Sequence, residues 1–202
     1  MPVALVPGNH DVFDMVTLEN YRKIYGQHDY YNFAAYNVEF IALNSITLIS
    51  NLTEFEAETR KQWEWAEATL KRARDLNRDH IIVFMHYPPF NEHEFEEETY
   101  FNFPPAQRAR FLTLMRNYGV KVVLAGHKHE TFQVATDDEE VMIYVVGGTS
   151  AVFDDNGFGY REFSVIDSNP LTQTYKNILW EKYRSKKPME CPSIFMNKKI
   201  VK

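Results

Sequence analysis

Short apolar runs alternate along the chain with longer amphipathic stretches. Three of the runs are rich in β-branched residues and are typical of strands buried on both faces; they occupy residues 2–6, 81–85 and 120–124. Two amphipathic stretches with helical spacing, at 53–76 and 104–119, directly precede the second and third runs. A helix followed at once by a buried strand is typical of a parallel sheet.

The remaining pattern adds a shorter helix and further strands. Helical spacing from Thr17 to Tyr25 predicts a helix that ends at Gly26. Residues 30–36 and 38–44 predict two strands around a tight turn at Asn37. Beyond Glu130 the pattern favours strands alone, at 131–135, 141–146, 161–166 and 172–180. We therefore expect an α/β fold, with two long helices covering parallel strands and an antiparallel sheet following them.

The two long helices carry their own boundary signals. Thr53 and Glu56 have the spacing of a capping box at the start of the 53–76 helix. The other helix is expected to begin at Pro104 or Pro105 and to stop at Gly119. The inward positions predicted for the first helix are Phe55, Trp63, Ala66 and Leu70.

Composition limits the classes of protein that this chain can represent. Its 202 residues, 45% hydrophobic and 25% charged, suit one globular domain, which we place at 1–181 with a basic tail at 182–202. No apolar run is long enough to cross a membrane. Cys191 is the only cysteine, which excludes an intrachain disulfide and favours a reducing, cytoplasmic location. The net charge of -6 disfavours nucleic acid as a partner.

Histidines follow all three buried runs. Gly8-Asn9-His10-Asp11 follows the first, His86 the second, and Gly126-His127-Lys128-His129 the third. A lone histidine after a strand is usually structural, but three such placements are unlikely to be coincidence. Because ligand sites in parallel sheets lie at the carboxyl ends of the strands, we expect these side chains to converge. The expected cluster is Asn9, His10, His86, His127 and His129, whose donors suit zinc, iron or manganese.

The order of these motifs resembles the calcineurin-like metallophosphoesterase family. Residues 100–103 and 119–121 resemble the single-domain subgroup that includes protein serine/threonine phosphatases. The resemblance implies a metallophosphatase-like sandwich of two mixed β-sheets flanked by helices. It also implies a dinuclear centre of divalent metal ions, and hydrolysis of phosphate esters, phosphoproteins among them, by metal-activated water.

The resemblance implies a role for each site residue. Asn9, through its side-chain oxygen, and His86 and His127 would bind the second metal ion, whereas His129 would reach the first. His10 would be the proton donor to the leaving group. Asp11 would orient the His10 ring, with helix capping as an equally favoured alternative.

The sequence departs from the family pattern at its start. The family's Asp-x-His and Gly-Asp motifs, which supply carboxylates to both ions, have no match here: no aspartate stands two residues before a histidine and no glycine precedes an aspartate. We therefore expect an N-terminally incomplete domain with a weakened first metal site. The alternative function is that of a non-catalytic relative retaining the scaffold and one weakly bound ion. A strand at 2–6 without neighbours would expose an apolar edge and favour self-association.

An acidic segment, 92–98, carries five glutamates among seven residues. A solvated loop is its more common explanation. The functional alternative is a lid over the metal site that repels mismatched anionic substrates. An acidic lid also disfavours a nuclease, which needs a basic groove.

Overall fold

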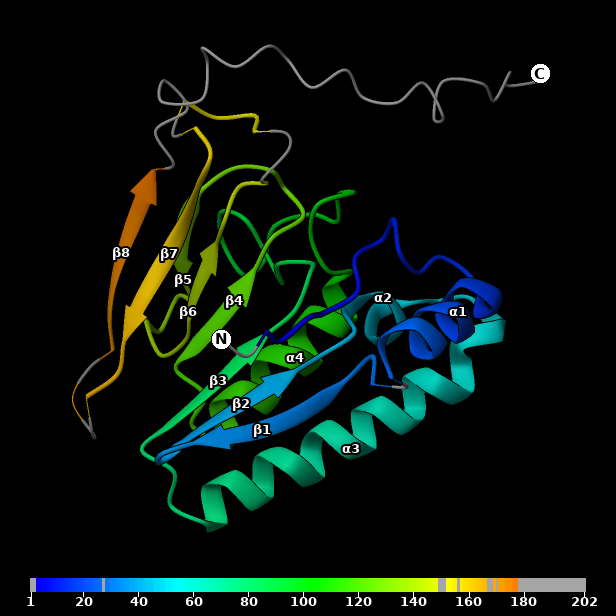
Figure 1. Ribbon diagram of the computed structural model, residues 1–202, viewed down its shortest axis with the longest axis horizontal. Helices are drawn as coiled ribbons and strands as arrows, with labels where there is room; N and C mark the ends of the chain where they lie inside the picture. The colour runs from blue at the N-terminus through cyan, green and yellow to red at the C-terminus, as the bar shows by residue number, and fades with distance from the viewer. Residues whose placement is uncertain are drawn as a thin grey trace.

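The computed structural model describes residues 3–26, 28–148, 152–155, 157–166, 169 and 171–177. Its main element is a six-stranded sheet in the order β1-β2-β3-β4-β6-β5, beside a two-stranded sheet β7-β8 (Figure 1). The strands are β1 (Tyr31–Ala35), β2 (Val38–Ala42), β3 (His80–Phe84), β4 (Val122–Ala125), β5 (Phe132–Ala135), β6 (Met142–Val145), β7 (Gly159–Ser164) and β8 (Thr172–Asn177). The helices are α1 (Met15–Tyr25), α2 (Ser45–Ile49), the 3-10 turn η1 (Thr53–Phe55), α3 (Glu56–Asp75) and α4 (Pro105–Asn117). The predicted tail at 182–202 lies outside the described residues.

The centre of the large sheet is parallel. Strands β2, β3, β4 and β6 run in one direction, and β1 and β5 pair antiparallel at the two edges. The α/β class predicted from the sequence is confirmed. In the described part of the chain the second sheet is an antiparallel hairpin, in line with the antiparallel sheet expected after the parallel strands.

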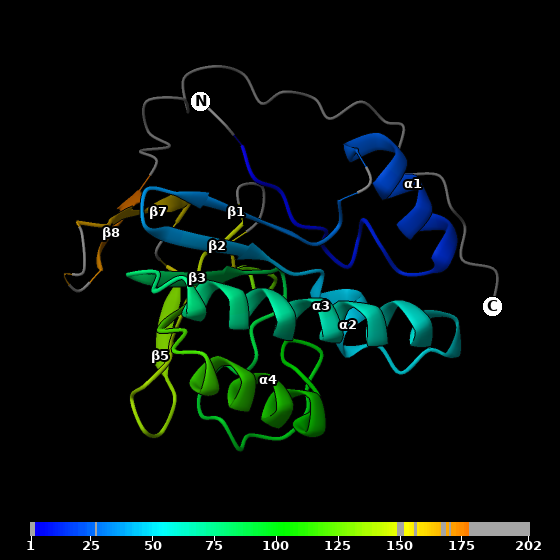
Figure 2. The same cartoon turned by 90° about the horizontal axis from the view of Figure 1, so that it is seen from below.

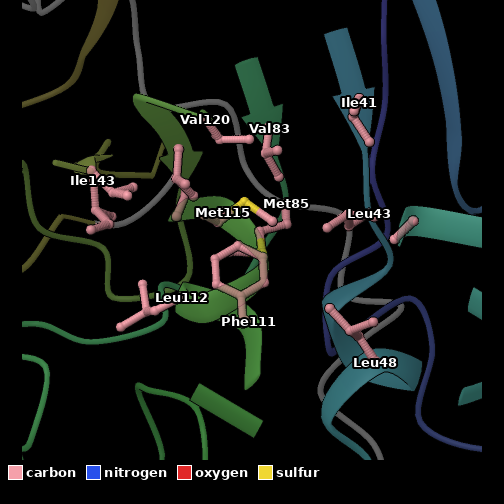
Figure 3. Close-up of a cluster of buried hydrophobic side chains, with 14 of the residues drawn as sticks. Ile41, Leu43, Leu48, Val83, Met85, Phe111, Leu112, Met115, Val120 and Ile143 are labelled. Atoms are coloured by element: carbon pink, nitrogen blue, oxygen red, sulfur yellow. The ribbon is translucent and has the colours of Figure 1, made fainter. Parts of the chain in front are cut away.

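One face of the large sheet is covered by the long helices. Figure 2 shows α3 and α4 together on the side of the sheet opposite to α1. The register aligns Ile41, Val83, Val123 and Ile143 across the four parallel strands, and all four side chains are fully buried. The burial of Phe111 and Met115 of α4 against these strands (Figure 3) makes this face the main core.

The opposite face is covered only in part. Val165 and Leu171, at the ends of the β7–β8 hairpin, pack near Ile82 and Val122. Further along the same face lies an apolar hollow of about 510 Å³. Its lining includes Ala4, Val6, Phe33, Phe40, Phe84 and Leu124.

The segment before the first histidine motif is not a strand. Residues 3–8 have no regular structure, so the strand predicted at 2–6 is wrong in its described part. The Leu5 backbone exchanges hydrogen bonds with the Tyr31 hydroxyl (2.7 and 2.9 Å) rather than with a strand partner. The prolines at positions 2 and 7 remove two backbone donors from any ladder. Two of the three histidine motifs therefore follow strands.

Helix starts differ from the prediction in two places. The first helix begins at Met15, two residues early, because the Asp14 carboxylate accepts the Thr17 N–H at 2.7 Å. The predicted capping box at Thr53 does not form: residues 53–55 make a 3-10 turn, and α3 starts at Glu56 without a side-chain cap. The four predicted inward positions of this helix region are all buried, as expected.

Other boundaries follow the sequence closely. The hairpin β1–β2 turns at Tyr36 and Asn37, and Tyr36 adopts φ +53°. Helix α4 starts at Pro105 and ends before Gly119, which adopts φ +71°. Among the described residues, no helix has both the length and the apolar character needed to span a membrane.

Candidate metal centre

The candidate site lies where β3 and β4 end. His86 follows β3 by two residues and His127 follows β4 by two. The Gly126 N–H donates to the His86 carbonyl at 3.0 Å, which ties the two post-strand loops together. The carboxyl ends of adjacent parallel strands thus bring two imidazoles together, as the sequence predicted.

Three side-chain atoms converge at this point. Asn9 Oδ1 lies 2.9 Å from His86 Nε2, and His127 Nδ1 lies 3.1 Å from the same nitrogen. Donor atoms that share a tetrahedral ion at about 2.1 Å are separated by roughly 3.4 Å. The two separations from His86 Nε2 are therefore slightly shorter than the spacing between ligands of one ion.

The three converging atoms carry more lone pairs than protons, which favours binding of a cation. His127 donates from Nε2 to the Tyr100 carbonyl at 2.9 Å, so Nδ1 of the neutral ring carries a lone pair. Asn9 Oδ1 is an acceptor by nature. His86 Nε2 can hold at most one proton, although two acceptors face it. An oxygen and two imidazole nitrogens with surplus lone pairs fit a borderline divalent cation.

Burial keeps both imidazoles neutral. Loss of solvent lowers the pKa of His86 to about 4, and repulsion from a protonated His127 adds to this shift. Burial also lowers the pKa of His127, with partial opposition from its hydrogen bond to the Tyr100 carbonyl. Neutral imidazole is the form that binds metal ions.

Two local backbone features allow this convergence. A Cβ on Gly8 would lie 3.1 Å from His86 Cε1, so glycine lets the chain approach the ring closely. His127 and His129 have φ values of +66° and +60°, which are unusual for residues with a side chain. At His127 the turn is closed by the Lys128 N–H, which donates to the Gly126 carbonyl at 2.8 Å.

The other predicted residues, His10, Asp11 and His129, lie around this cluster. His10 is exposed, and both His10 and His129 lie close enough for their charge to lower the pKa values of His86 and His127. The His129 ring stacks on Phe153 at a centroid distance of 5.0 Å. Asp11 accepts the Gly8 N–H at 2.8 Å and closes the turn that carries Asn9 and His10. The helix-capping alternative for Asp11 is wrong, because the cap of α1 is Asp14.

The cluster contains no carboxylate. Within the described ranges, no group of three or more His, Cys, Asp or Glu side chains is placed to hold an ion. The converging set has only two such side chains, His86 and His127, because its third donor is the Asn9 amide oxygen. Neutral donors fit one cation but leave its charge unbalanced.

Sequence reasoning gave no role to Tyr100. Its carbonyl accepts from His127, and its hydroxyl accepts from Asn9 Nδ2 at 2.7 Å. Tyr87, Tyr100 and Phe101 all have ring centroids within 5.5 Å of the His127 ring. Since Tyr100 and Asn9 are 91 residues apart, no local pattern could have shown this contact.

A larger hollow of about 970 Å³ lies elsewhere, between α1 and α3. Several of its charged groups bind one another: Arg22 contacts Asp29 at 2.7 Å and Glu58 at 2.6 Å. The Arg22–Glu58 pair connects the two helices, which gives the hollow a structural explanation.

The fold and the converging donors define a metallophosphatase-type protein. The family described as calcineurin-like phosphoesterase matches residues 1–131, and the chain belongs to this family. At the level of the family, the assignment is a hydrolase of phosphate esters.

Curated relatives carry the name serine/threonine-protein phosphatase CPPED1. The human protein is 33% identical over 133 residues, covering 64% of this chain and 42% of the relative. The Danio rerio protein is 27% identical over 172 residues, covering 84% of this chain and 54% of the relative. The chain thus spans about half or less of the length of these relatives.

Two solved structures show a partial likeness. A dimetal phosphatase from Danio rerio has a TM-score of 0.46 at 15% identity, with 65% of this chain and 53% of that chain covered. Purple acid phosphatase PPD1 from yellow lupin seeds has a TM-score of 0.49 at 17% identity, with 75% of this chain and 30% of that chain covered.

Proposed function

We propose that Asn9, His86 and His127 bind one divalent cation and that the protein containing this chain hydrolyses phosphate esters. The observation that carries the proposal is the convergence of Asn9 Oδ1 and His127 Nδ1 on His86 Nε2, at 2.9 and 3.1 Å. Manganese, iron and zinc suit these donors. Phosphoproteins enter as a substrate class through the phosphatase name of the relatives.

Each predicted site residue has a defined part in this proposal. A bound cation would neutralise phosphate charge and lower the pKa of a bound water. Asn9, His86 and His127 would hold the ion in a neutral, buried setting. His10, exposed on the turn closed by Asp11, would donate a proton to the leaving oxygen. His129 would serve a second ion of a dinuclear centre.

The second candidate function is that of a non-catalytic relative that binds a single ion. The lack of a carboxylate among the described donors favours it, since neutral ligands balance no charge. A reducing, cytoplasmic location, indicated by the single cysteine, is part of both proposals.

Metal titration tests the site. The chelator-treated full chain should bind one equivalent of Mn²⁺ or Zn²⁺ in isothermal titration calorimetry. Removing a direct ligand with His127→Ala should weaken binding by more than the roughly 10- to 100-fold typical of an outer-shell change. His28→Ala, which alters an exposed histidine outside the cluster, should bind as the unmodified chain does. Absence of binding to the unmodified chain would overturn the metal site.

Turnover separates the two candidate functions. With Mn²⁺ present, hydrolysis of p-nitrophenyl phosphate that falls about 100-fold or more in His10→Ala supports the hydrolase. Stoichiometric metal binding without turnover supports the non-catalytic relative.

A further inference from the structure

Two charged side chains, Arg108 and Glu96, hold the loop between β3 and α4 in place through hydrogen bonds to its backbone. Arg108 of α4, only 1% exposed, donates to the carbonyls of Glu94 (3.1 Å), Glu96 (2.5 Å) and Phe103 (2.8 Å). The Glu96 carboxylate accepts the backbone N–H groups of Asn91 (2.9 Å) and Glu92 (2.8 Å).

Further contacts fix the same loop. Asn102 donates to the Glu96 carboxylate, and Glu94 pairs with Arg116 at 2.8 Å. Two glutamates of the acidic segment are thus structural anchors, so the prediction of a solvated loop is wrong for Glu94 and Glu96. Segment 91–103, named here the anchored loop, is preorganised by these bonds.

The anchored loop places Tyr100 in contact with two of the three residues of the cluster, Asn9 and His127. The Tyr100 carbonyl accepts from His127 Nε2 at 2.9 Å, and the Tyr100 hydroxyl accepts from Asn9 Nδ2 at 2.7 Å. An amide has chemically different ends, and only its oxygen can bind a cation. Because the hydroxyl takes the nitrogen end of Asn9, the oxygen end faces His86.

We propose that Tyr100 is a positioning residue that sets the orientation of the Asn9 amide and the tautomer of His127 for metal binding. The inference rests on the proposed metal site. The Tyr100 side chain is 62% exposed, so its ring contributes little to burial, while its hydroxyl is committed to Asn9. Orientation of a ligand by such a partner is worth about 10- to 100-fold in metal affinity.

The test begins with Tyr100→Phe, which removes the hydroxyl and keeps both the ring and the backbone carbonyl. We expect its Mn²⁺ affinity to fall about tenfold relative to the unmodified chain. The matched control is Tyr25→Phe, which changes a tyrosine of similar exposure (51%) on α1 and should bind Mn²⁺ as the unmodified chain does.

A second background shows whether the effect passes through the amide. In Asn9→Asp both branches of the side chain end in oxygen, so no orientation remains to be set. Tyr100→Phe should therefore cost less than about twofold in that background, against about tenfold in the Asn9 background. Equal losses in the two backgrounds, or no loss in either, would overturn the positioning role.

Nuclear magnetic resonance gives a readout that needs no metal. The protons of the Asn9 side-chain NH₂ should exchange slowly with water in the metal-free unmodified chain and in Tyr25→Phe. In Tyr100→Phe the same protons should exchange rapidly. Unprotected Asn9 protons in the unmodified chain would overturn the inference even if Mn²⁺ binds. Failure of the unmodified chain to bind Mn²⁺, with the Asn9 protons protected, would instead reject the metal site and leave the orientation of Asn9 by Tyr100 supported.

Discussion

The pKa of His86 makes the metal-free chain sensitive to acid. Its folded pKa of about 4 lies below the ordinary value of 6.5, so between these two pH values the unfolded chain binds more protons. The stability that this ring contributes is present above about pH 6.5 and is lost as the pH falls towards 4. Its upper limit is about 3 kcal/mol, at 1.36 kcal/mol for each pKa unit.

Urea unfolding of the metal-free chain between pH 7 and pH 4.5 measures this loss. We expect the free energy of unfolding to fall as pH falls, and to fall less steeply in His86→Gln, which has no proton to gain. His28→Gln should keep the slope of the unmodified chain, since His28 is exposed. Identical slopes for His86→Gln and the unmodified chain would contradict the pKa shift.

At the residue scale, the sequence revealed the donors but not what orients them. His86 and His127 could be predicted to meet because each follows a buried parallel strand. Asn9 was expected there from a strand at 2–6 and from the family motif, but only the motif supports it, since residues 3–8 have no regular structure. The contacts of Tyr100 with Asn9 and His127 could not be predicted, because they depend on how the long loop between β3 and α4 folds back.

At the scale of elements, the anchored loop depends on one buried guanidinium. Arg108→Ala would leave the three carbonyls of Glu94, Glu96 and Phe103 without this donor. Because each buried unsatisfied group costs about 1–3 kcal/mol, we expect a loss of about 3 kcal/mol or more in the free energy of unfolding. Urea denaturation measures the loss.

The same helix offers a control. Arg110 is exposed and lies over the Trp63 ring at 4.1 Å, so Arg110→Ala should cost about 1 kcal/mol or less. Limited proteolysis should cut segment 91–103 faster in Arg108→Ala than in Arg110→Ala. Equal stability of the two variants would show that the loop does not depend on Arg108.

Elements with strong periodicity could be predicted, and elements set by single polar contacts could not. Helices α3 and α4 and strands β3 and β4 follow from apolar spacing. The five-residue helix α2 was missed because it depends on Asn44, which accepts from Ile46 at 3.0 Å and is itself fixed by Gln62, 18 residues away. The capping box at Thr53 failed because the chain makes a 3-10 turn there first.

At the scale of the whole molecule, the large sheet has unequal faces. The helix face is buried, whereas the other face leaves Phe33 38% exposed at the apolar hollow. The predicted association through an edge at 2–6 lacks its strand. We propose that self-association proceeds through this apolar face instead.

Sedimentation velocity over a range of protein concentrations tests this proposal. The unmodified chain should sediment faster as concentration rises, and Phe33→Glu should reduce the effect by placing a charge on the apolar face. Tyr36→Glu, at a fully exposed turn position, should leave it unchanged. Concentration-independent sedimentation of the unmodified chain as a monomer would contradict the proposal.

The overall class could be predicted because the order of the motifs and the alternation of helix and strand agree. The incomplete cover of one sheet face could not, since it depends on where the segment at 3–8 runs and on how far the β7–β8 hairpin reaches.

His127 and His129 have left-handed backbone conformations, which lower the stability of the fold while keeping two imidazoles at the proposed metal site. Glycine or asparagine would adopt these φ values at lower energetic cost than histidine does. A directed-evolution campaign that selects for heat resistance alone would therefore tend to erase these imidazoles. Any engineering of this scaffold should therefore screen for binding of the proposed ion as well as for thermal tolerance, because heat resistance alone selects against histidine at these two positions.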